Sequence, residues 1–369
     1  MNRFPPFSGS YAAGDVQFLL KPVQIEMTPI EVKEQLIQSG ARHYSDMLSQ
    51  EPEPTSYHLD LFDKALNMGA TRLATEVVML AKSLISHFGD TPIVLVSLVR
   101  AGVPLGVMLH QALRKMGKQS YHYGISIIRD RGIDNTALSY IEQQHGTDGL
   151  VFVDGWTGKG AITAELSRSL AGRAGYSGIP RLVVLADPCG CAWLAASDDD
   201  WLIPFGIMGA PVSGLISRSI WCDNGLHGCV KCDHLSRFEC SRLLVDTVAD
   251  CRDRLDLTAI PPALIPITAA SMVTQPSPEK IALQQLSQRV ISALAERYQV
   301  ENINRIKPGI AEATRAILRR VPEQVLVRSL DDPDIALLVY LARQKNIVIS
   351  EVGDLIGQYR AVTIIRKVA

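Results

Sequence analysis

Residues 151–163, VFVDGWTGKGAIT, combine a carboxylate, a lysine and three glycines in a spacing that can hold a phosphate. Apolar residues typical of a strand end at Asp154, and a glycine-rich loop with Lys159 follows. A carboxylate at a strand end can accept hydrogen bonds from the vicinal hydroxyls of a ribose. Backbone amides at the start of the next helix can bind its 5-phosphate. The segment therefore predicts a ribose-phosphate site.

Two better-known phosphate loops do not match this segment. A Walker A loop needs Ser or Thr after Gly-Lys, and here Gly160 follows Lys159. A dinucleotide fingerprint places its acid about 20 residues after the glycines, and here Asp154 comes before them. The simpler alternative is an ordinary strand–turn–helix with a glycine turn and a capping threonine.

Two further loops carry arginines directly after apolar runs. LVRAGVPLG (98–106) places Arg100, Ala101 and Gly102 where backbone amides can meet a diphosphate. IIRDRGID (127–134) places Arg129 and Arg131 in a segment suited to a mobile lid that excludes water. The alternatives are a surface arginine beside a strand–helix turn and a solvated charged turn.

These loops need a common scaffold, and the apolar pattern predicts one. Continuous apolar runs alternate with helical stretches, which favours a parallel sheet covered on both faces. In such sheets ligands bind at the carboxyl ends of the strands, so the loops gather at one edge together with Asp187. The expected strands are 93–99, 121–128, 149–154 and 181–187, and the expected helices are 62–88, a stretch through Lys115, 135–145 and 160–173.

The chain of 369 residues is long enough for two domains. Proline-rich residues 256–280 predict a linker between a first domain at 1–255 and a second at 281–369. The net charge of −1 and the lack of a long apolar run predict no membrane span. Seven cysteines without a signal segment favour reduced thiols in the cytoplasm.

The strand that runs into Asp154 and its loop resemble the signature of the phosphoribosyltransferases. This resemblance implies a type I phosphoribosyltransferase-like α/β fold, and a cis non-proline peptide near Arg100. It also implies transfer of the 5-phosphoribosyl group from its 1-diphosphate (PRPP) to an unknown nitrogen acceptor. Gly155 departs from the pattern, because it stands where that family has a second acid.

The resemblance assigns roles to individual residues. Asp154, Arg129 and Arg131 are the expected catalytic residues, and Asp154 is also expected to hold Mg²⁺ indirectly, as a cation that prefers oxygen ligands. Asp187 is the expected contact of the acceptor. The expected substrate-binding set is Arg100, Ala101, Gly102, Trp156, Thr157, Gly158, Lys159, Gly160, Thr163 and Asp187.

The order of motifs over residues 9–240 is similar to a narrower bacterial family of tellurium-resistance and stress gene clusters. Some members of that family are labelled StiP-type cysteine proteases. A cysteine protease is therefore an alternative, with Cys189 or Cys191 as nucleophile and His227 or His43 as its partner. A second alternative is a non-catalytic sensor that binds a ribose phosphate or nucleotide. Cys222, Cys229, Cys232 and Cys240 could bind zinc, although only CVKC has ligand spacing.

Residues 281–369 carry 13 Lys or Arg and 9 Asp or Glu, and they predict an alternating α/β unit. This unit resembles the Pelota-type RNA-binding domain, which implies structured RNA as a partner. The resemblance places RNA contacts on a basic helix within 307–320, at Gly309, Glu312, Arg315 and Arg319, whereas Ala311 replaces a family asparagine. The alternative is a solvated basic helix in a docking domain.

Overall fold

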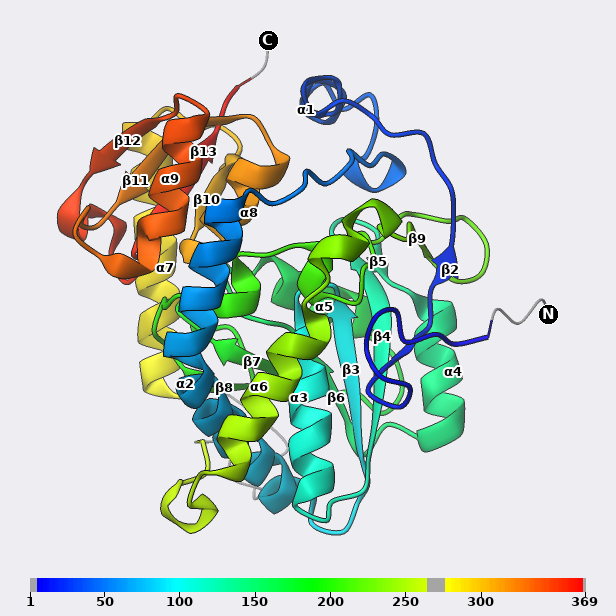
Figure 1. Cartoon of the computed structure of the whole chain (residues 1–369). Coiled ribbons are helices and arrows are strands. Elements are labelled where there is room, and N and C mark those ends of the chain that lie inside the picture. The colour runs from blue at the N-terminus through cyan, green and yellow to red at the C-terminus, as the bar shows by residue number, and fades with distance from the viewer. Residues whose placement is uncertain (1–4, 264–275, 368–369) are drawn as a thin grey trace.

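The computed structural model describes residues 5–263 and 276–367, which form an N-terminal α/β unit and a smaller C-terminal unit (Figure 1). Within these residues the first unit contains a seven-stranded sheet of order β1-β4-β3-β6-β7-β8, with β5 paired to β4. Every pairing is parallel except that of β4 with β5. The mostly parallel sheet expected from the sequence is confirmed. Its strands are β1 (Gln17–Phe18), β3 (Ile93–Val99), β4 (Ser120–Ile128), β5 (Gly132–Ile133), β6 (Leu150–Val153), β7 (Leu182–Ala186) and β8 (Leu194–Ser197).

Helices cover both faces of this sheet, as its continuous apolar strands require. On one face α2 (Ser56–Phe88), α3 (Gly102–Lys115) and α6 (Ser241–Asp253) pack against one another. Residues of α4 (Asn135–His145) and α5 (Ala161–Leu170) join the core of the other face. Helix α2 is longer than the expected helix 62–88, because the Thr55 hydroxyl caps it by accepting from the His58 amide at 3.2 Å.

Three short elements complete the N-terminal unit. Strands β2 (Lys21–Pro22) and β9 (Gly228–Cys229) form a separate parallel pair, and α1 (Ile30–Gln38) lies apart from the sheet (Figure 1). In the described part of the chain, no helix is long and apolar enough to cross a bilayer.

The C-terminal unit has a four-stranded sheet of order β10-β13-β11-β12, in which only the β11–β12 pairing is parallel. Its elements are α7 (Pro278–Arg297), β10 (Ile306–Pro308), α8 (Ile310–Arg319), β11 (Pro322–Val327), α9 (Ala336–Gln344), β12 (Val348–Glu351) and β13 (Ala361–Ile365). Helix α7 begins inside the expected linker 256–280, of which residues 264–275 lie outside the described residues. The Ser277 hydroxyl caps it by accepting from the Lys280 amide at 3.3 Å.

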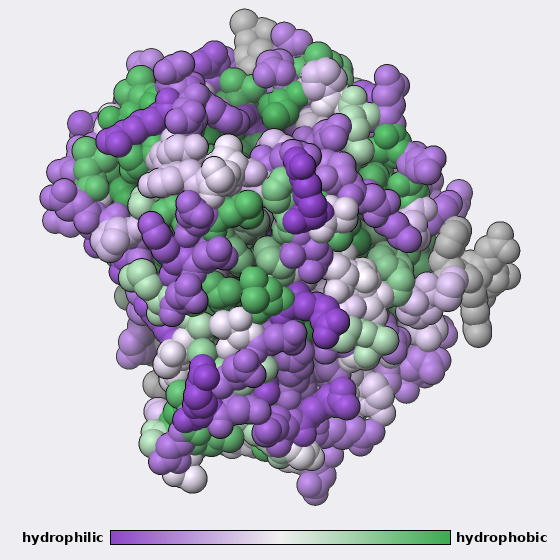
Figure 2. Space-filling model, in the orientation of Figure 1, coloured by the Kyte–Doolittle hydropathy of each residue, from purple (hydrophilic) through white to green (hydrophobic). Residues whose placement is uncertain are grey.

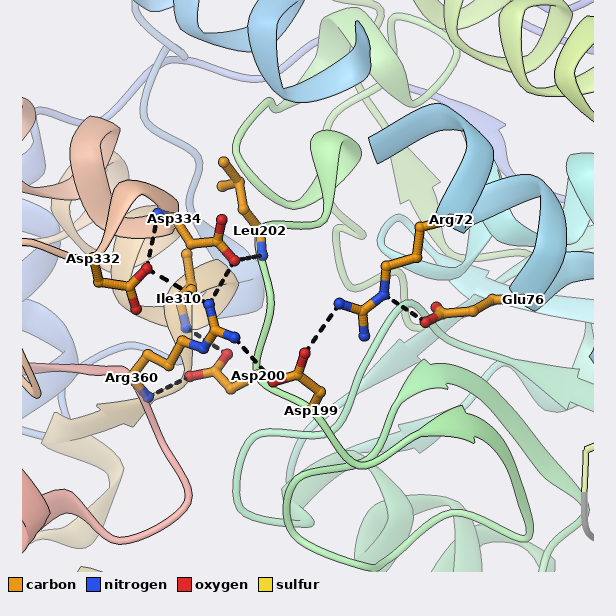
Figure 3. A network of polar contacts seen from close by, with 9 residues as sticks. All are labelled: Arg72, Glu76, Asp199, Asp200, Leu202, Ile310, Asp332, Asp334 and Arg360. Atoms are coloured by element: carbon orange, nitrogen blue, oxygen red, sulfur yellow. Dashed lines mark hydrogen bonds and ion pairs between the residues drawn. The ribbon is translucent and has the colours of Figure 1, made fainter. Parts of the chain in front are cut away.

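A polar network joins the two units (Figure 3). The Arg360 guanidinium pairs with Asp334 at 2.7 Å in its own unit and with Asp199 at 3.3 Å in the first unit. Asp199 also pairs with Arg72 of α2 at 3.0 Å. The buried Asp200 carboxylate accepts from the Ile310 amide at 2.9 Å and the Arg360 amide at 2.8 Å. An aspartate of the first unit therefore caps α8 of the second.

Candidate functional site

Two of the expected loops touch at the carboxyl end of the sheet, and their glycines permit the contact. A Cβ on Gly102 would lie 2.0 Å from the Val153 carbonyl oxygen, and one on Gly155 would lie 3.0 Å from the Ala101 carbonyl oxygen. An acid at position 155 would therefore push the two loops apart, which explains the departure at Gly155. The peptide bond between Val99 and Arg100 is cis, as the resemblance implied.

On the face seen in Figure 2, hydrophobic residues are scattered among hydrophilic ones. This surface pattern does not mark a functional site, so the cavities are the better candidates. One cavity, with a volume of about 530 Å³, lies between the two units. Three acids line it: Glu51, Asp154 and Glu312. The cationic side chains that line it are Lys33, Arg100, Arg129, Lys159, Arg218, Lys231, Lys307, Arg315, Arg319 and Arg320. We call this space the cationic cleft.

Most of the residues predicted from the sequence do line the cationic cleft. They come from four separate stretches of the chain. The parallel sheet brings the first three together as expected, and α8 of the C-terminal unit provides the fourth. The predicted residues in the lining are Arg100, Ala101, Arg129, Asp154, Trp156, Thr157, Gly158, Lys159, Gly160, Thr163, Glu312, Arg315 and Arg319.

The Asp154 carboxyl group is 9% exposed, and its Oδ1 accepts from the Gly155 amide at 2.8 Å. Burial raises the pKa of Asp154 to about 7. The Arg100 guanidinium pairs with Glu51 and donates to the Ile216 carbonyl oxygen at 2.9 Å. Burial alone would raise the pKa of Glu51. The charges of Arg100 and Arg319, together with hydrogen bonds from Arg100 and the Ala210 amide, outweigh it and lower that pKa to about 2.

Several cations of the cleft have no ion pair with a carboxylate among the described residues. Burial lowers the pKa of Lys159 to about 6 and that of Lys307 to about 8, and neighbouring cations act in the same direction. Burial lowers the pKa of Arg315 to about 10, and the Arg100 charge acts in the same direction. The same two causes lower the pKa of Arg319 well below its usual range. The cleft therefore carries a positive charge that is only partly neutralised within the protein.

Four predicted residues are absent from this lining: Gly102, Arg131, Asp187 and Gly309. Arg131 does not line the cleft, because its guanidinium pairs with Asp46, at 2.9 Å through Nη2, and lies over the Trp221 ring. Its expected catalytic role stays a prediction, and its side chain lies outside the cleft lining. The segment 127–134 is the end of β4 and its turn into β5. Asp187 is 2% exposed and is likewise absent from the lining, so it does not face an acceptor in the cleft.

The basic face of α8 is turned toward the first unit and not toward solvent. Arg315 is 8% exposed and its guanidinium lies 4.5 Å from the centroid of the Trp156 ring. Gly309 lies against Asp200, and Glu312 lies against Gly158. RNA contacts at Gly309, Glu312, Arg315 and Arg319 stay a prediction, and in this arrangement an RNA helix has no open access to them.

A second cavity, of about 300 Å³, lies on the other side of the Lys159–Gly160 peptide and is lined by Cys189 and Cys191. We call it the thiol cavity. Lys159, Gly160 and Thr163 line both spaces, so the N-terminus of α5 separates them. No histidine is among the described residues that line the thiol cavity, so neither His43 nor His227 reaches it.

Asp187 shapes the loop that carries these thiols. Its Oδ1 accepts from the Thr157 hydroxyl at 2.6 Å and from the Cys191 amide at 2.8 Å, and its Oδ2 accepts from the Ala192 amide at 2.9 Å. Lys280 of α7 lies beside it, with Nζ 3.5 Å from Asp187 Oδ2. The loop is therefore fixed by the first unit on one side and by α7 on the other.

The two thiols differ in pKa. The Cys189 thiol hydrogen-bonds to Cys191, which lowers the pKa of Cys191, and the Lys280 charge acts in the same direction. The same hydrogen bond and burial raise the pKa of Cys189, which is 1% exposed. Cys191 is partly exposed and its Sγ is 2.8 Å from where a Cβ on Gly160 would lie. Cys191 is thus a partly exposed thiol beside the N-cap of α5, with a pKa below its ordinary value.

The remaining cysteines do not form a metal site. Within residues 5–263 and 276–367, no group of three or more His, Cys, Asp or Glu side chains could hold a metal ion. Burial raises the pKa of Cys232 to about 11 and those of Cys229 and Cys240 to about 12. The possible zinc site is therefore not found in the described residues.

The expected magnesium ion does not suit the residues around Asp154. This carboxylate is already bonded to the Gly155 amide, and cations outnumber acids in the cleft lining. Magnesium prefers one or two free carboxylates together with phosphate oxygens. Magnesium binding at Asp154 stays a prediction, and the proposed peptide hydrolysis does not require it.

Several site residues were not predicted from the sequence. Lys33, Arg218 and Lys307 reach the cleft from segments far apart in the chain, and no local pattern marks them. Lys280 had a usable signal, since Ser277-Pro278-Glu279 is typical of a helix start. Cys191 was named in the sequence, but nothing local indicated a helix N-terminus beside it.

Comparisons with known proteins give two family matches. Residues 9–249 match the model described as tellurite-like stress resistance cysteine protease StiP, and residues 285–367 match the PELOTA RNA binding domain. A relative from Acinetobacter baylyi, cysteine protease StiP, is 49% identical over 375 residues, which cover 98% of this chain and 94% of the relative.

A solved structure, of hypoxanthine phosphoribosyltransferase from Trypanosoma cruzi in complex with IMP, matches with a TM-score of 0.23 and 14% identity. It covers 34% of this chain and 70% of that chain, and at such a score it carries no argument. The type I phosphoribosyltransferase fold therefore stays a prediction, finer than the parallel α/β sheet observed.

These comparisons contradict the expected phosphoribosyl transfer, because both the family model and the relative are named as a cysteine protease. They confirm the resemblance to the stress-resistance family and to the Pelota domain. The family model covers well over half of the chain and the relative nearly all of it. The chain belongs to the family described as tellurite-like stress resistance cysteine protease StiP, with a PELOTA RNA binding domain in residues 285–367.

Proposed function

We propose that this chain is an enzyme that hydrolyses peptide bonds through a cysteine thiolate, with Cys191 as the nucleophile. The observation that carries the proposal is the 49% identity, over 98% of the chain, to a protein named cysteine protease StiP. Among the seven free cysteines, Cys191 and Cys222 are partly exposed, and only the first of these two has a lowered pKa.

The surroundings of Cys191 suit a nucleophile. A thiolate attacks a carbonyl without needing a separate base, so the missing histidine is no obstacle to the first step. The N-cap of α5, Gly160, provides no side-chain hydrogen bond, and the Cys191 sulfur is 2.8 Å from where a Cβ on this glycine would lie. Backbone amides at the start of a helix can stabilise the oxyanion that forms during attack.

The proposed reaction has two stages. The Cys191 sulfur attacks the peptide carbonyl carbon, and the electron pair of the carbonyl moves to its oxygen, beside the α5 amides. When the intermediate collapses, the C–N bond breaks and the leaving amine takes a proton from the Lys280 ammonium group. Water then attacks the thioester, which releases the new carboxylate and restores the thiolate. One proton of that water returns to Lys280, and the other is released to solvent as the carboxylic acid product ionises.

A labelled denatured protein, such as fluorescent casein, tests the proposal under reducing conditions. Wild type is expected to cleave it, Cys191→Ala is expected to lose cleavage, and Lys280→Met is expected to lower kcat more than it raises KM. Cys222→Ser is the matched control, since Cys222 is also partly exposed but has a raised pKa and does not line the thiol cavity. Cleavage that survives in Cys191→Ala and stops in Cys222→Ser would move the nucleophile to the other thiol.

The match of residues 285–367 to an RNA binding domain favours a second function, RNA binding by the C-terminal unit. Fluorescence anisotropy with a labelled RNA hairpin tests it on the full chain. Binding through phosphate contacts is expected to weaken steeply as salt rises, because each contact releases counterions. Absence of binding even at low salt would remove this function.

A further inference from the structure

We propose that the cationic cleft binds a compact oligophosphate anion, such as inorganic diphosphate or the phosphate chain of a nucleotide, held between the N-terminal unit and α8. This goes beyond peptide hydrolysis, because the thiolate and Lys280 lie in the other cavity. The inference rests on the charge of the lining, its unpaired donors, its size and the origin of its side chains.

The first observation is the imbalance of charge. Ten lysine and arginine side chains and three carboxylates line one cavity between the units. Arg100, Arg129 and Arg320 are paired with carboxylates. Lys159, with its pKa lowered to about 6, is mostly neutral at pH 7, and the other six carry the surplus. Two of the carboxylates are already committed, since Glu51 pairs with Arg100 and the Asp154 Oδ1 accepts from the Gly155 amide. Like charges at such density repel one another strongly in a partly buried space, and a bound polyanion relieves that repulsion.

The second observation is a pair of unsatisfied donors. Arg100 is 5% exposed and Arg315 is 8% exposed, and the Nε atom of each has no hydrogen-bond partner among the described residues. A buried charged donor without a partner is costly, and native proteins seldom retain one. Guanidinium groups bind phosphate through paired N–H donors. Arg100 already donates to Glu51 and to the Ile216 carbonyl oxygen, so Arg315, which is in no ion pair among the described residues, is the better phosphate ligand.

The third observation is the backbone beside these arginines. Gly160, Ala161 and Thr163, at the first turn of α5, also line the cleft, and no side chain caps that helix. The amides of an uncapped first turn bind phosphoryl oxygens. This helix start lines both cavities, so an anion bound in the cleft shares the α5 amides with the oxyanion proposed for peptide hydrolysis.

The size of the cleft selects the ligand. A volume of about 530 Å³ accommodates a nucleotide or a short phosphate chain. A folded RNA helix is far larger, and the lining closes around the space from both units. Arg315, Lys307 and Arg319 come from the C-terminal unit, whereas Arg100, Arg218 and Lys33 come from the first. The anion would therefore hold the two units together.

Isothermal titration of the full chain with inorganic diphosphate tests the proposal. ADP and adenosine are titrated separately, to distinguish a free oligophosphate from a nucleotide. Wild type is expected to bind diphosphate, and Arg315→Gln and Arg319→Gln are each expected to bind it about 10- to 100-fold more weakly, as for loss of a charge-assisted hydrogen bond. Arg343→Gln, an exposed arginine of α9 outside the cleft, is the control and is expected to bind like wild type.

Thermal unfolding keeps the test decisive if a variant folds poorly. Without anion, Arg319→Gln is expected to be at least as stable as wild type, because a surplus positive charge has been removed. With millimolar diphosphate, wild type is expected to gain melting temperature and Arg319→Gln to gain much less. A purely structural role for Arg319 predicts lower stability in both conditions, which would contradict the proposal.

Three results would overturn it. The first is the absence of diphosphate binding by folded wild type, and the second is equal weakening in Arg343→Gln. The third is binding of an RNA hairpin that Arg315→Gln abolishes and that diphosphate does not displace. Binding of ADP and diphosphate but not adenosine supports the phosphate chain as the recognised group. Peptide cleavage is measured separately, so its failure and the failure of anion binding are distinguishable.

Discussion

The reactivity proposed for Cys191 comes from its neighbours. Its sulfur has the Cys189 thiol as a hydrogen-bond donor, the Lys280 charge nearby and the start of α5 beside it. By contrast, burial raises the pKa of Cys222, although this side chain is also partly exposed. Exposure alone therefore does not identify the nucleophile, and the local donors do.

Replacing Cys189 by Ala is expected to make Cys191 less acidic. The hydrogen bond from Cys189 is the largest cause of the lowered pKa of Cys191, so losing it raises that pKa. The rate of iodoacetamide labelling at Cys191, measured against pH, reports the thiolate fraction. The midpoint is expected below the ordinary value of about 8.5 in wild type and higher in Cys189→Ala. An unchanged midpoint would show that the helix and Lys280 determine the pKa instead.

Residue types and strand ends were enough to predict much of the cleft. Arg100 and Asp154 each follow a buried apolar strand, and parallel strands bring such positions to one edge. Arg131 was misplaced because it follows the same rule, yet Asp46 from a distant segment holds it. The expected phosphoribosyl transfer was wrong for a related reason. The glycine-rich loop at 154–160 is visible in the sequence, whereas the tertiary contacts that lower the pKa of Cys191 are not.

At the scale of elements, the N-terminus of α5 is the boundary between the two cavities. Gly160, its N-cap, has φ of +79°, and a Cβ there would lie 2.8 Å from the Cys191 sulfur. Gly172, just beyond the other end of α5, has φ of +74° with nothing within 4 Å of a Cβ. The two glycines therefore share the backbone constraint and differ only in the thiol contact.

Gly160→Ala and Gly172→Ala separate these two effects. Each is expected to lower the free energy of unfolding by about 1–2 kcal/mol, because a left-handed residue with a Cβ is strained. Only Gly160→Ala is expected to displace the Cys191 sulfur and slow its labelling severalfold. Urea unfolding and iodoacetamide rates measure the two effects side by side. Slower labelling in both variants would mean that helix stability, and not the contact, controls the thiol.

Of the helices of the C-terminal unit, α8 and α9 lie within the stretches predicted to be helical, and α7 was not predicted. Helix α7 was not predicted because the expected linker was extended to residue 280, although Ser277 and Pro278 are typical of a helix start. The basic face of α8 was read as an RNA surface, since a sequence shows which residues share a face and not what covers it. Burial of Arg315 over Trp156 depends on the other unit.

At the scale of the molecule, the two units share their sites. Tyr359 of the C-terminal unit donates to the Gly158 carbonyl oxygen at 2.7 Å, and Lys159 donates back to the Ile306 carbonyl oxygen at 3.0 Å. Two residues of α7 contact the loop that carries Cys189 and Cys191. Lys280 donates to the Ala192 carbonyl oxygen, and Gln284 donates to the Gly190 carbonyl oxygen at 2.8 Å. Neither cavity has its full lining without the C-terminal unit.

Asp200 tests how strongly this union matters (Figure 3). In Asp200→Ala the buried amides of Ile310 and Arg360 lose their acceptor, which is expected to cost ~2–5 kcal/mol in total. Asp198→Ala is the control, because Asp198 is exposed two residues away. Burial raises the pKa of Asp200 to about 6, so its ionisation opposes folding. The stability gained by keeping this carboxyl protonated is full below pH 3.8 and is lost as the pH rises through about 6.

The loss in Asp200→Ala, relative to wild type, is therefore expected to be smaller at pH 7.5 than at pH 5. Because Asp200 caps α8, the variant is also expected to weaken diphosphate binding, while Asp198→Ala leaves both properties unchanged. Chemical denaturation at the two pH values and titration with diphosphate provide the measurements. A variant as stable as wild type at both pH values would show that the cap on α8 does not hold the units together. A destabilised variant with unchanged diphosphate affinity would show that the cleft keeps its shape without the cap.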